Sequence, residues 1–333
     1  MEMTESPNTL LTPALRAFLG EIIDYAGLFP PAGLPLDEAV HNYARYRHDP
    51  EAWMLARFVM PVGRLDELRP FAKLFREPEP FVFSVLGTGG RTPEAFLDAF
   101  DRDLEAIDRF HEDHHDRVRA DVMEVRLPPS LLHAESAPLR DFFAAGHRRL
   151  VMAGTAQLDL FYEVPYDVDD AVIRTVLVAM ADHNSTQAVP ARSEVGFKMR
   201  CGGLEPDAFP PVEHVARVIA GCRNAGVRFK ATAGLHHPVR HYSDEVDAYM
   251  HGFFNVFGAA VLAVEHELAE DGLQAILLEE DPEAFQFTKE EFSWRDLTAP
   301  LGTLYYVRER LAVSFGSCSF DEPRDDLKAL EFI

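Results

Sequence analysis

Residues 194–240 read EVGFKMRCGGLEPDAFPPVEHVARVIAGCRNAGVRFKATAGLHHPVR, and this stretch decides the expected fold. Two apolar runs, at 195–200 and 227–233, flank a segment at 212–225 whose apolar residues recur at helical spacing. Pro211 precedes that segment, and the first turn of a helix tolerates proline. A strand, a helix and a second strand in this order predict a parallel βαβ unit.

The same alternation runs through most of the chain. Helical segments at 36–46, 93–111 and 169–183 add to the one at 212–225. Apolar strands that alternate with helices indicate a parallel sheet covered on both faces. The eight candidate strands lie at 22–29, 56–62, 80–87, 121–127, 158–164, 195–200, 227–233 and 311–316. Eight such units predict a (β/α)8 TIM-like barrel, and an open doubly wound sheet is the alternative.

We expect a single barrel domain over 1–333, because an α/β barrel often uses a chain of this length. Residues 1–20 precede the first strand, and we expect a helix there that closes the bottom of the barrel. Residues 241–305 are too long for one connection, so they are predicted to be an insertion between strands 7 and 8. We expect this insertion to be either a lid or an oligomer contact, the latter in a homo-oligomer.

The composition excludes several classes of protein. Asp and Glu number 55 against 32 Lys and Arg, which gives a formal net charge of −23. A chain this acidic is not expected to bind nucleic acid or a membrane surface, because both require a cationic face. The three cysteines form no CxxC pair, so they predict neither a disulfide framework nor a zinc knuckle. The first residues lack a signal-peptide pattern, and we expect a cytoplasmic protein.

Charged side chains occur inside several of the predicted strands. Residues two apart on a strand share a face, and the apolar Phe197 and Met199 suit burial against helices, which leaves Lys198 and Arg200 facing the interior. The same argument brings together Asp24, Glu124, Arg126, Glu163, Lys198, Arg200 and Lys230. Such a cluster is either an internal salt-bridge network or a site for a small anionic substrate, a carboxylate or a phosphate.

A lysine surrounded by other cations is expected to have a lowered pKa, which makes its amine a nucleophile toward a carbonyl. Lys198 is the candidate imine-forming residue, and Lys230 is the alternative. Glu124 and Glu163 are candidate proton carriers. Asp24 is expected to orient or pair with a cation, and two arginines are expected to clamp the substrate anion: Arg126 and Arg200. The simpler interpretation of Lys198 is that it only anchors an anion and forms no covalent bond.

Further candidate substrate-binding residues lie in the turns after the last strands. They are Thr232, His236, His237, Gly316, Ser317 and Ser319. Adjacent histidines point apart on an extended chain, so at most one of the pair is expected in the pocket. The glycine and serines suit a backbone nest for an anion, or else a tight turn in which Ser319 caps the next helix.

The HEDHH run at 111–115 fits a zincin pattern, but its place before a strand puts it at the barrel bottom, and we exclude it as a metal site.

The segments GFKMRCGG and VRFKATAGLHHP resemble the paired-lysine region of class I deoxyribose-phosphate-type aldolases. The resemblance covers about residues 194–240. It implies that Lys198 matches the lysine that forms the Schiff base and that Lys230 matches the lysine that perturbs it, with Gly234 near the glycine turn. Of the family's four-residue run after the first lysine, only the glycine is present, at Gly202. The resemblance implies a lyase of the aldolase type that uses no cofactor and no metal.

Two alternatives remain open from the sequence. The first is a metal-dependent hydrolase or isomerase of the same fold, in which a divalent ion is held by Asp24, Glu124, Glu163 and His236. The second is a non-catalytic anion-binding or assembly protein, whose functional surface is the insertion at 241–305. The leading prediction is a lyase that acts on a small anionic carbonyl compound.

Overall fold

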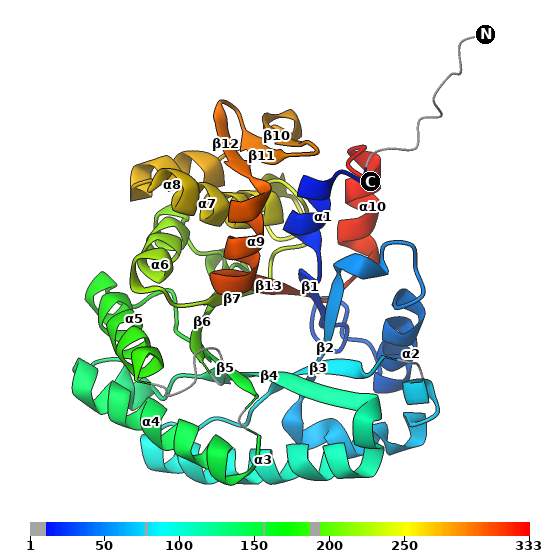
Figure 1. The fold of residues 1–333 in the computed structure, drawn as a ribbon, viewed down its shortest axis with the longest axis vertical. Coiled ribbons are helices and arrows are strands. Elements are labelled where there is room, and N and C mark those ends of the chain that lie inside the picture. Colours follow the sequence, from blue (N-terminus) through cyan, green and yellow to red (C-terminus); the bar gives the residue numbers. More distant parts are fainter. Residues whose placement is uncertain (1–10, 77–78, 156, 187–193) are drawn as a thin grey trace.

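The computed structural model describes residues 11–76, 79–155, 157–186 and 194–333. Its centre is a closed barrel of parallel strands in the order β1-β13-β7-β6-β5-β4-β3-β2 (Figure 1). The barrel strands are β1 (Ile23–Tyr25), β2 (Leu55–Pro61), β3 (Phe81–Leu86), β4 (Val118–Arg126), β5 (Asp159–Glu163), β6 (Val195–Arg200), β7 (Phe229–Thr232) and β13 (Ala312–Ser317). The predicted (β/α)8 barrel is confirmed, and the open doubly wound sheet is wrong.

Helices surround the ring of strands (Figure 1). They are α2 (Leu36–Tyr46), α3 (Pro93–His114), α4 (Ser136–Met152), α5 (Asp170–Ser185) and α6 (Val212–Ala225). In α6 the expected pattern is realised: Val215, Ile219 and Cys222 lie on its buried face. This helix ends at Gly226, which adopts a left-handed conformation with φ of 63° that glycine accepts without steric cost.

The first strand is shorter than expected. Residues 22–29 were predicted to be extended, but the chain leaves the strand after Tyr25. The backbone N–H of Phe29 donates to the carbonyl of Ala26 at 2.9 Å, which closes a turn. Two prolines without N–H groups, Pro30 and Pro31, follow this turn and cannot continue a ladder.

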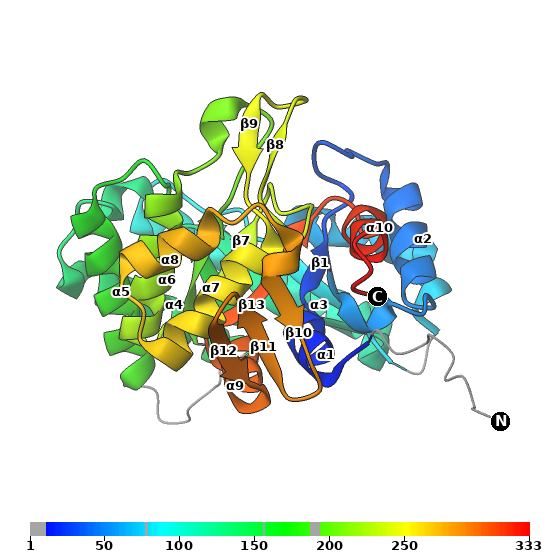
Figure 2. The ribbon, with the colours of Figure 1, turned by 90° about the horizontal axis from the view of Figure 1, so that it is seen from above.

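The predicted insertion at 241–305 contains several elements with different positions. A hairpin of β8 (His241–Ser243) and β9 (Ala248–Met250) projects from the body of the protein (Figure 2). The helices α7 (Phe253–His266) and α8 (Glu270–Leu277) pack against α6. The sheet β10 (Phe285–Phe287), β11 (Glu291–Trp294) and β12 (Leu297–Pro300) is followed by α9 (Leu301–Arg310).

The phenylalanines of this segment form an aromatic core outside the barrel. Phe254 of α7 lies 5.1 Å, between ring centroids, from Phe287 of β10. Phe18 of α1 (Pro13–Leu19) contacts both of these rings and Phe292. The rings thus fix α1, α7 and the small sheet to one another, which explains why the segment is rich in phenylalanine.

The expected helix at 1–20 is present in part as α1, and residues 1–10 of that expectation lie outside the described residues. The chain ends with α10 (Asp321–Ala329), which follows β13. Across the described part of the chain, every helix is too short or too polar to cross a lipid bilayer.

Candidate functional site

The register of the barrel strands sets two lysines side by side. Glu163 of β5 is paired with Lys198 of β6, which is paired in turn with Lys230 of β7. Because the strands are parallel and the three residues share one level, their side chains enter the barrel interior together. Lys198 and Lys230 are both buried, with 7% and 1% of their surface exposed.

Carboxylates surround the amine of Lys198. Its Nζ lies 3.0 Å from Oε2 of Glu124 and 2.9 Å from Oε2 of Glu163. Both glutamates are buried as well. Lys198 therefore forms a bridge between strands β4 and β5 and stands as a buried ammonium ion between two anions.

Lys230 lies deeper and is held from several sides. Its Nζ donates to Oδ2 of Asp24 at 2.6 Å, to Oε1 of Glu124 at 2.7 Å and to the hydroxyl of Ser84 at 3.3 Å. The Ser84 hydroxyl donates to Glu124 at 2.6 Å, and the Ser314 hydroxyl donates to Asp24 at 2.6 Å. A buried charge is tolerated when it is paired and hydrogen-bonded, and every group in this set meets that condition.

The ion pairs continue beyond the lysines in both directions. On one side Glu163 lies 3.5 Å from Nε of Arg126. On the other side Asp24 lies 3.5 Å from a guanidinium nitrogen of Arg57, which also holds Asp121 at 2.6 Å. We call this run of alternating charges the barrel ion chain: Arg126, Glu163, Lys198, Glu124, Lys230, Asp24, Arg57 and Asp121.

The expected lowering of the pKa of Lys198 is wrong for this state of the protein. Burial alone would lower that pKa, but the negative charges of Glu124 and Glu163 raise it above its ordinary value. In the same way burial would raise the pKa of Glu124, and the two lysines lower it. The prediction failed because Glu124 lies between the lysines, so each cation faces an anion and not the other cation.

A cavity of about 280 Å³ opens above the lysines. Six of the predicted site residues line it: Glu124, Lys198, Arg200, Thr232, His236 and Gly316. Lys198 and Arg200 belong to β6 and Thr232 ends β7, so the cavity lies at the carboxyl ends of the strands, where barrel enzymes place their active sites. Other lining residues include Phe29, Pro30, Pro31, Leu204 and Cys318.

The loops after β6 and β7 meet at the wall of this cavity. Gly234 has φ of 71°, and a Cβ atom there would lie 2.8 Å from Cα of Gly202. Only glycine permits the backbone at 234 to adopt this positive φ and to lie so close to Gly202. The glycines noted in the sequence thus allow the two loops that carry Arg200 and Thr232 to close together.

Other predicted site residues do not line the cavity. Lys230 and Asp24 lie below it, fully buried, and Glu163 reaches it only through Lys198. The side chain of Arg126 is 81% exposed. His237 turns toward α10 and bonds Asp326.

The two serines of the predicted anion nest have local partners. The Ser319 hydroxyl accepts from the backbone N–H of Glu322 at 3.0 Å, in the first turn of α10. Ser317 is 1% exposed, and its hydroxyl accepts from the backbone N–H of Ser319 at 3.3 Å. Among the three residues of the predicted nest, Gly316 is the one that lines the cavity.

His236 connects the cavity to α10. Its Nδ1 lies 2.9 Å from Oε2 of Glu322 and 4.0 Å from Sγ of Cys318. Burial would lower the pKa of His236, but Cys318 and Glu322 raise it to about 9. His236 is therefore protonated at neutral pH and forms an ion pair with Glu322.

Several residues of the site were not found from the sequence. Ser84, Ser314 and Arg57 hold the buried charges, and Cys318 lines the cavity. A signal was present for the serines, because each is a small polar residue inside an apolar strand, FVFSVL and AVSFGS. Such a residue implies a buried polar partner.

The geometry gives no support to the metal alternative. Two lysines occupy the space between Asp24, Glu124 and Glu163, and His236 faces α10. Among the described residues, no three His, Cys, Asp or Glu side chains are grouped to hold a metal ion. In the HEDHH run, His111 accepts from the backbone N–H of Ala120, and His114 packs against Phe75 and Phe110.

No protein-family model matches this sequence, and no curated protein does. The structure is similar to a "putative deoxyribose-phosphate aldolase" from Toxoplasma gondii ME49, with 10% identity and a TM-score of 0.48, over 97% of this chain and 99% of that one. This neighbour carries the name of the family that residues 194–240 resemble.

Two further solved structures are similar over most of this chain. The TTHB071 protein from Thermus thermophilus has 12% identity and a TM-score of 0.41, over 93% of this chain and 96% of that one. The spore cortex-lytic enzyme SleL from Bacillus megaterium QM B1551 has 12% identity and a TM-score of 0.39, over 94% of this chain and 73% of that one.

Proposed function

We propose that this protein is a lyase of the aldolase type, which acts on a small anionic carbonyl compound through an imine at Lys198. The observation that carries the proposal is the position of Lys198. Its amine belongs to a residue that lines the cavity at the barrel mouth, and two carboxylates lie within 3.0 Å of it. Lys230 is not the nucleophile in this proposal, because it lies below the cavity and is 1% exposed.

The reaction begins when the ammonium of Lys198 gives a proton to Glu163 or Glu124. The neutral amine then attacks the carbonyl carbon. The oxygen takes back one proton from that carboxyl group and a second from the attacking nitrogen, and it leaves as water to form the iminium ion. The bond between the carbons α and β to the iminium carbon then breaks: its electron pair forms the enamine double bond, and the iminium π pair moves to nitrogen. The hydroxyl on the β carbon gives its proton to a carboxylate and becomes the carbonyl of the first product. Protonation of the enamine and hydrolysis by water release the second product and restore the amine of Lys198. Lys230 is a positioning residue, because it holds Glu124 in place beside Lys198.

The anionic part of the substrate is bound by the cations at the mouth. Arg200 lines the cavity and donates only to the carbonyl of Gly202, at 3.3 Å, among the bonds of the described residues. It therefore retains donors for a carboxylate or phosphate. His236 lies on the same wall, where its protonated ring is paired with Glu322.

The test is reductive trapping of the full-length protein with cyanoborohydride. The probes are pyruvate and glyceraldehyde 3-phosphate, which represent anionic ketones and anionic aldehydes. We expect one of them to add its reduced mass to Lys198, located by peptide mass spectrometry. If neither probe forms an adduct with Lys198, the proposal is overturned.

The variant Lys198→Ala is expected to give no adduct with the reactive probe. The matched control is Lys289→Ala, which removes an exposed lysine and is expected to trap as the wild type does. Because Lys198→Ala removes one cationic partner from each of two buried carboxylates, its fold is checked by circular dichroism. The position of the adduct in the wild-type protein tests the proposal independently of that variant.

A further inference from the structure

A second and larger cavity lies at the opposite end of the barrel. Its volume is about 1040 Å³. Residues near the beginning of the strands line it, among them Arg57 of β2, Val82 of β3, Arg119 of β4 and Val313 of β13. The mouth cavity is lined instead by residues at the strand ends, so the two cavities are separated by the barrel interior.

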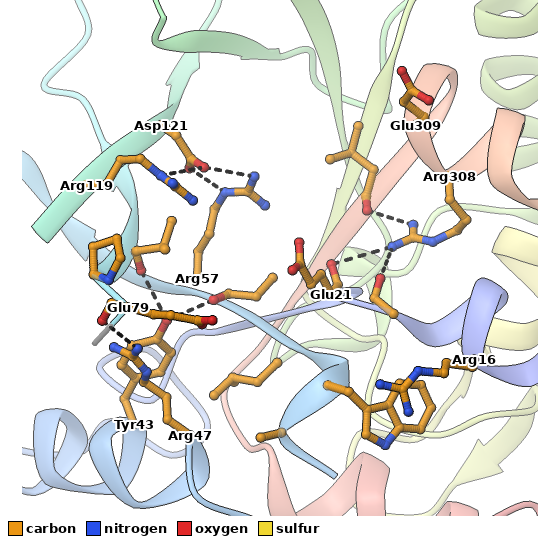
Figure 3. A pocket seen from close by; sticks show the side chains of 18 of the residues that line it. Arg16, Glu21, Tyr43, Arg47, Arg57, Glu79, Arg119, Asp121, Arg308 and Glu309 are labelled. Atoms are coloured by element: carbon orange, nitrogen blue, oxygen red, sulfur yellow. Dashed lines mark hydrogen bonds and ion pairs between the residues drawn. The ribbon is translucent and has the colours of Figure 1, made fainter. Parts of the chain in front are cut away.

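Five arginines face this bottom cavity: Arg16, Arg47, Arg57, Arg119 and Arg308. Figure 3 shows Arg57 and Arg119 on one side of the space and Arg308 on the opposite side. Four carboxylates also line it, namely Glu21, Glu79, Asp121 and Glu309. The three glutamates are exposed, whereas Arg47, Arg57 and Arg308 are partly buried, so the deeper wall is the more cationic one.

Arg308 carries a charge that its partners do not neutralise. Its guanidinium donates to the carbonyls of Gly20, Glu21, Ala312 and Val313, at 3.0, 3.5, 2.5 and 2.7 Å. Its Nε is buried and has no hydrogen-bond partner among the described residues. Burial lowers the pKa of Arg308 to about 9, which still leaves the guanidinium charged at neutral pH.

A second guanidinium on this lining has the same property. Arg47 donates to the carbonyl of Glu79 at 2.8 Å and lies over the ring of Phe81. Its Nη1 is buried without a partner in the described part of the chain. Asp121, in contrast, is already held between Arg57 and Arg119. Among the described residues, the guanidinium groups of Arg47 and Arg308 thus line the cavity with carbonyls and a ring as partners and without a carboxylate.

We propose that the bottom cavity is a second binding site, distinct from the mouth, for a small organic polyanion. The ligand is a phosphate ester or a polycarboxylate, because clustered anionic oxygens match guanidinium donors that face one space from several sides. A buried cation paired only with carbonyls gains most from such a ligand, since the ligand supplies the missing negative charge.

The test is titration calorimetry of the full-length protein with inorganic pyrophosphate and with citrate, in a phosphate-free buffer of low ionic strength. Arg308 is left unchanged because it donates to four backbone carbonyls of the fold. The test variant is Arg16→Gln combined with Arg47→Gln, and the exposed Arg16 is also replaced alone. The matched control replaces two exposed arginines of α3 and α4, Arg109→Gln with Arg148→Gln.

We expect the wild-type protein to bind at least one of the two anions, and the Arg16/Arg47 variant to bind it at least tenfold more weakly. The control and Arg200→Gln, which removes a cation of the mouth, are expected to change the dissociation constant less than twofold. Binding that is lost with Arg200→Gln and kept in the Arg16/Arg47 variant would overturn the proposal, as would the absence of binding by both anions. Neither result depends on catalysis at Lys198.

Discussion

Nζ of Lys230 lies 2.6 Å from Oδ2 of Asp24, although 206 positions separate the two residues in the sequence. This pair joins β7 to β1 across the interior of the barrel, and both side chains are buried. Together with Glu124 it supports the position of Lys198. The pair is the natural place to test whether the buried charges hold the barrel together.

The variant Asp24→Asn is expected to lower the free energy of unfolding by about 3–5 kcal/mol, the usual cost of leaving one partner of a buried ion pair uncompensated. Urea unfolding followed by circular dichroism measures this change. The control Asp98→Asn, on the exposed face of α3, is expected to change the same quantity by less than about 0.5 kcal/mol. Equal stabilities of the two variants would contradict the assigned role of Asp24.

The variant Glu124→Gln is expected to lower the pKa of Lys198, because it removes one of the two negative charges that raise that pKa. The pH at which reductive trapping reaches half its maximal rate should therefore shift to lower pH. The control is Glu112→Gln on the exposed face of α3, which should leave that pH unchanged. A shift of the Glu124 variant to higher pH would show that Glu124 does not stabilise the ammonium.

His236 is expected to make the stability of the protein depend on pH. Its pKa is about 9 in the folded protein and 6.5 ordinarily, so folding favours its protonated form. The resulting stabilisation, on the order of 3 kcal/mol, is fully present below pH 6.5 and is lost as the pH rises to about 9. The variant His236→Gln should flatten the free energy of unfolding over this range, whereas His133→Gln, at an exposed position, should retain the slope.

The two predicted clamp arginines are expected to differ. Arg200 lines the cavity, so Arg200→Gln should raise the half-saturating concentration of the trapping probe about 10–100-fold, as a lost charged hydrogen bond does. The side chain of Arg126 is 81% exposed, and Arg126→Gln should raise the half-saturating concentration less than threefold. Comparable effects of the two variants would indicate that the substrate reaches beyond the described cavity.

The sequence supported the barrel and the meeting of its charges because both depend on local periodicity. Alternation along a strand places Lys198 and Arg200 on one face whatever the neighbouring strands are. The sequence did not indicate that Glu124 lies between Lys198 and Lys230, because that depends on side-chain lengths across the closed barrel. This missing contact reversed the expected pKa shift of Lys198.

The bottom cavity was not indicated by the sequence at all. Arg16, Arg47 and Arg308 belong to α1, the end of α2 and α9, and each is an ordinary charged residue of a helical segment. Only the closure of the barrel brings them to one space. The small outer sheet was missed for a related reason, since its short strands have too few residues to show a period.

The barrel ion chain has a consequence for how the interior responds to its surroundings. From Glu163 to Arg57, each charge has a neighbour of opposite sign on either side. Each charge is therefore stabilised by its neighbours, and replacing one member by a neutral side chain weakens the electrostatic support of the members beside it. Loss of the charge of Lys198 would thus alter the electrostatic environment of Glu163 and Glu124 directly, and that of the more distant members only through them.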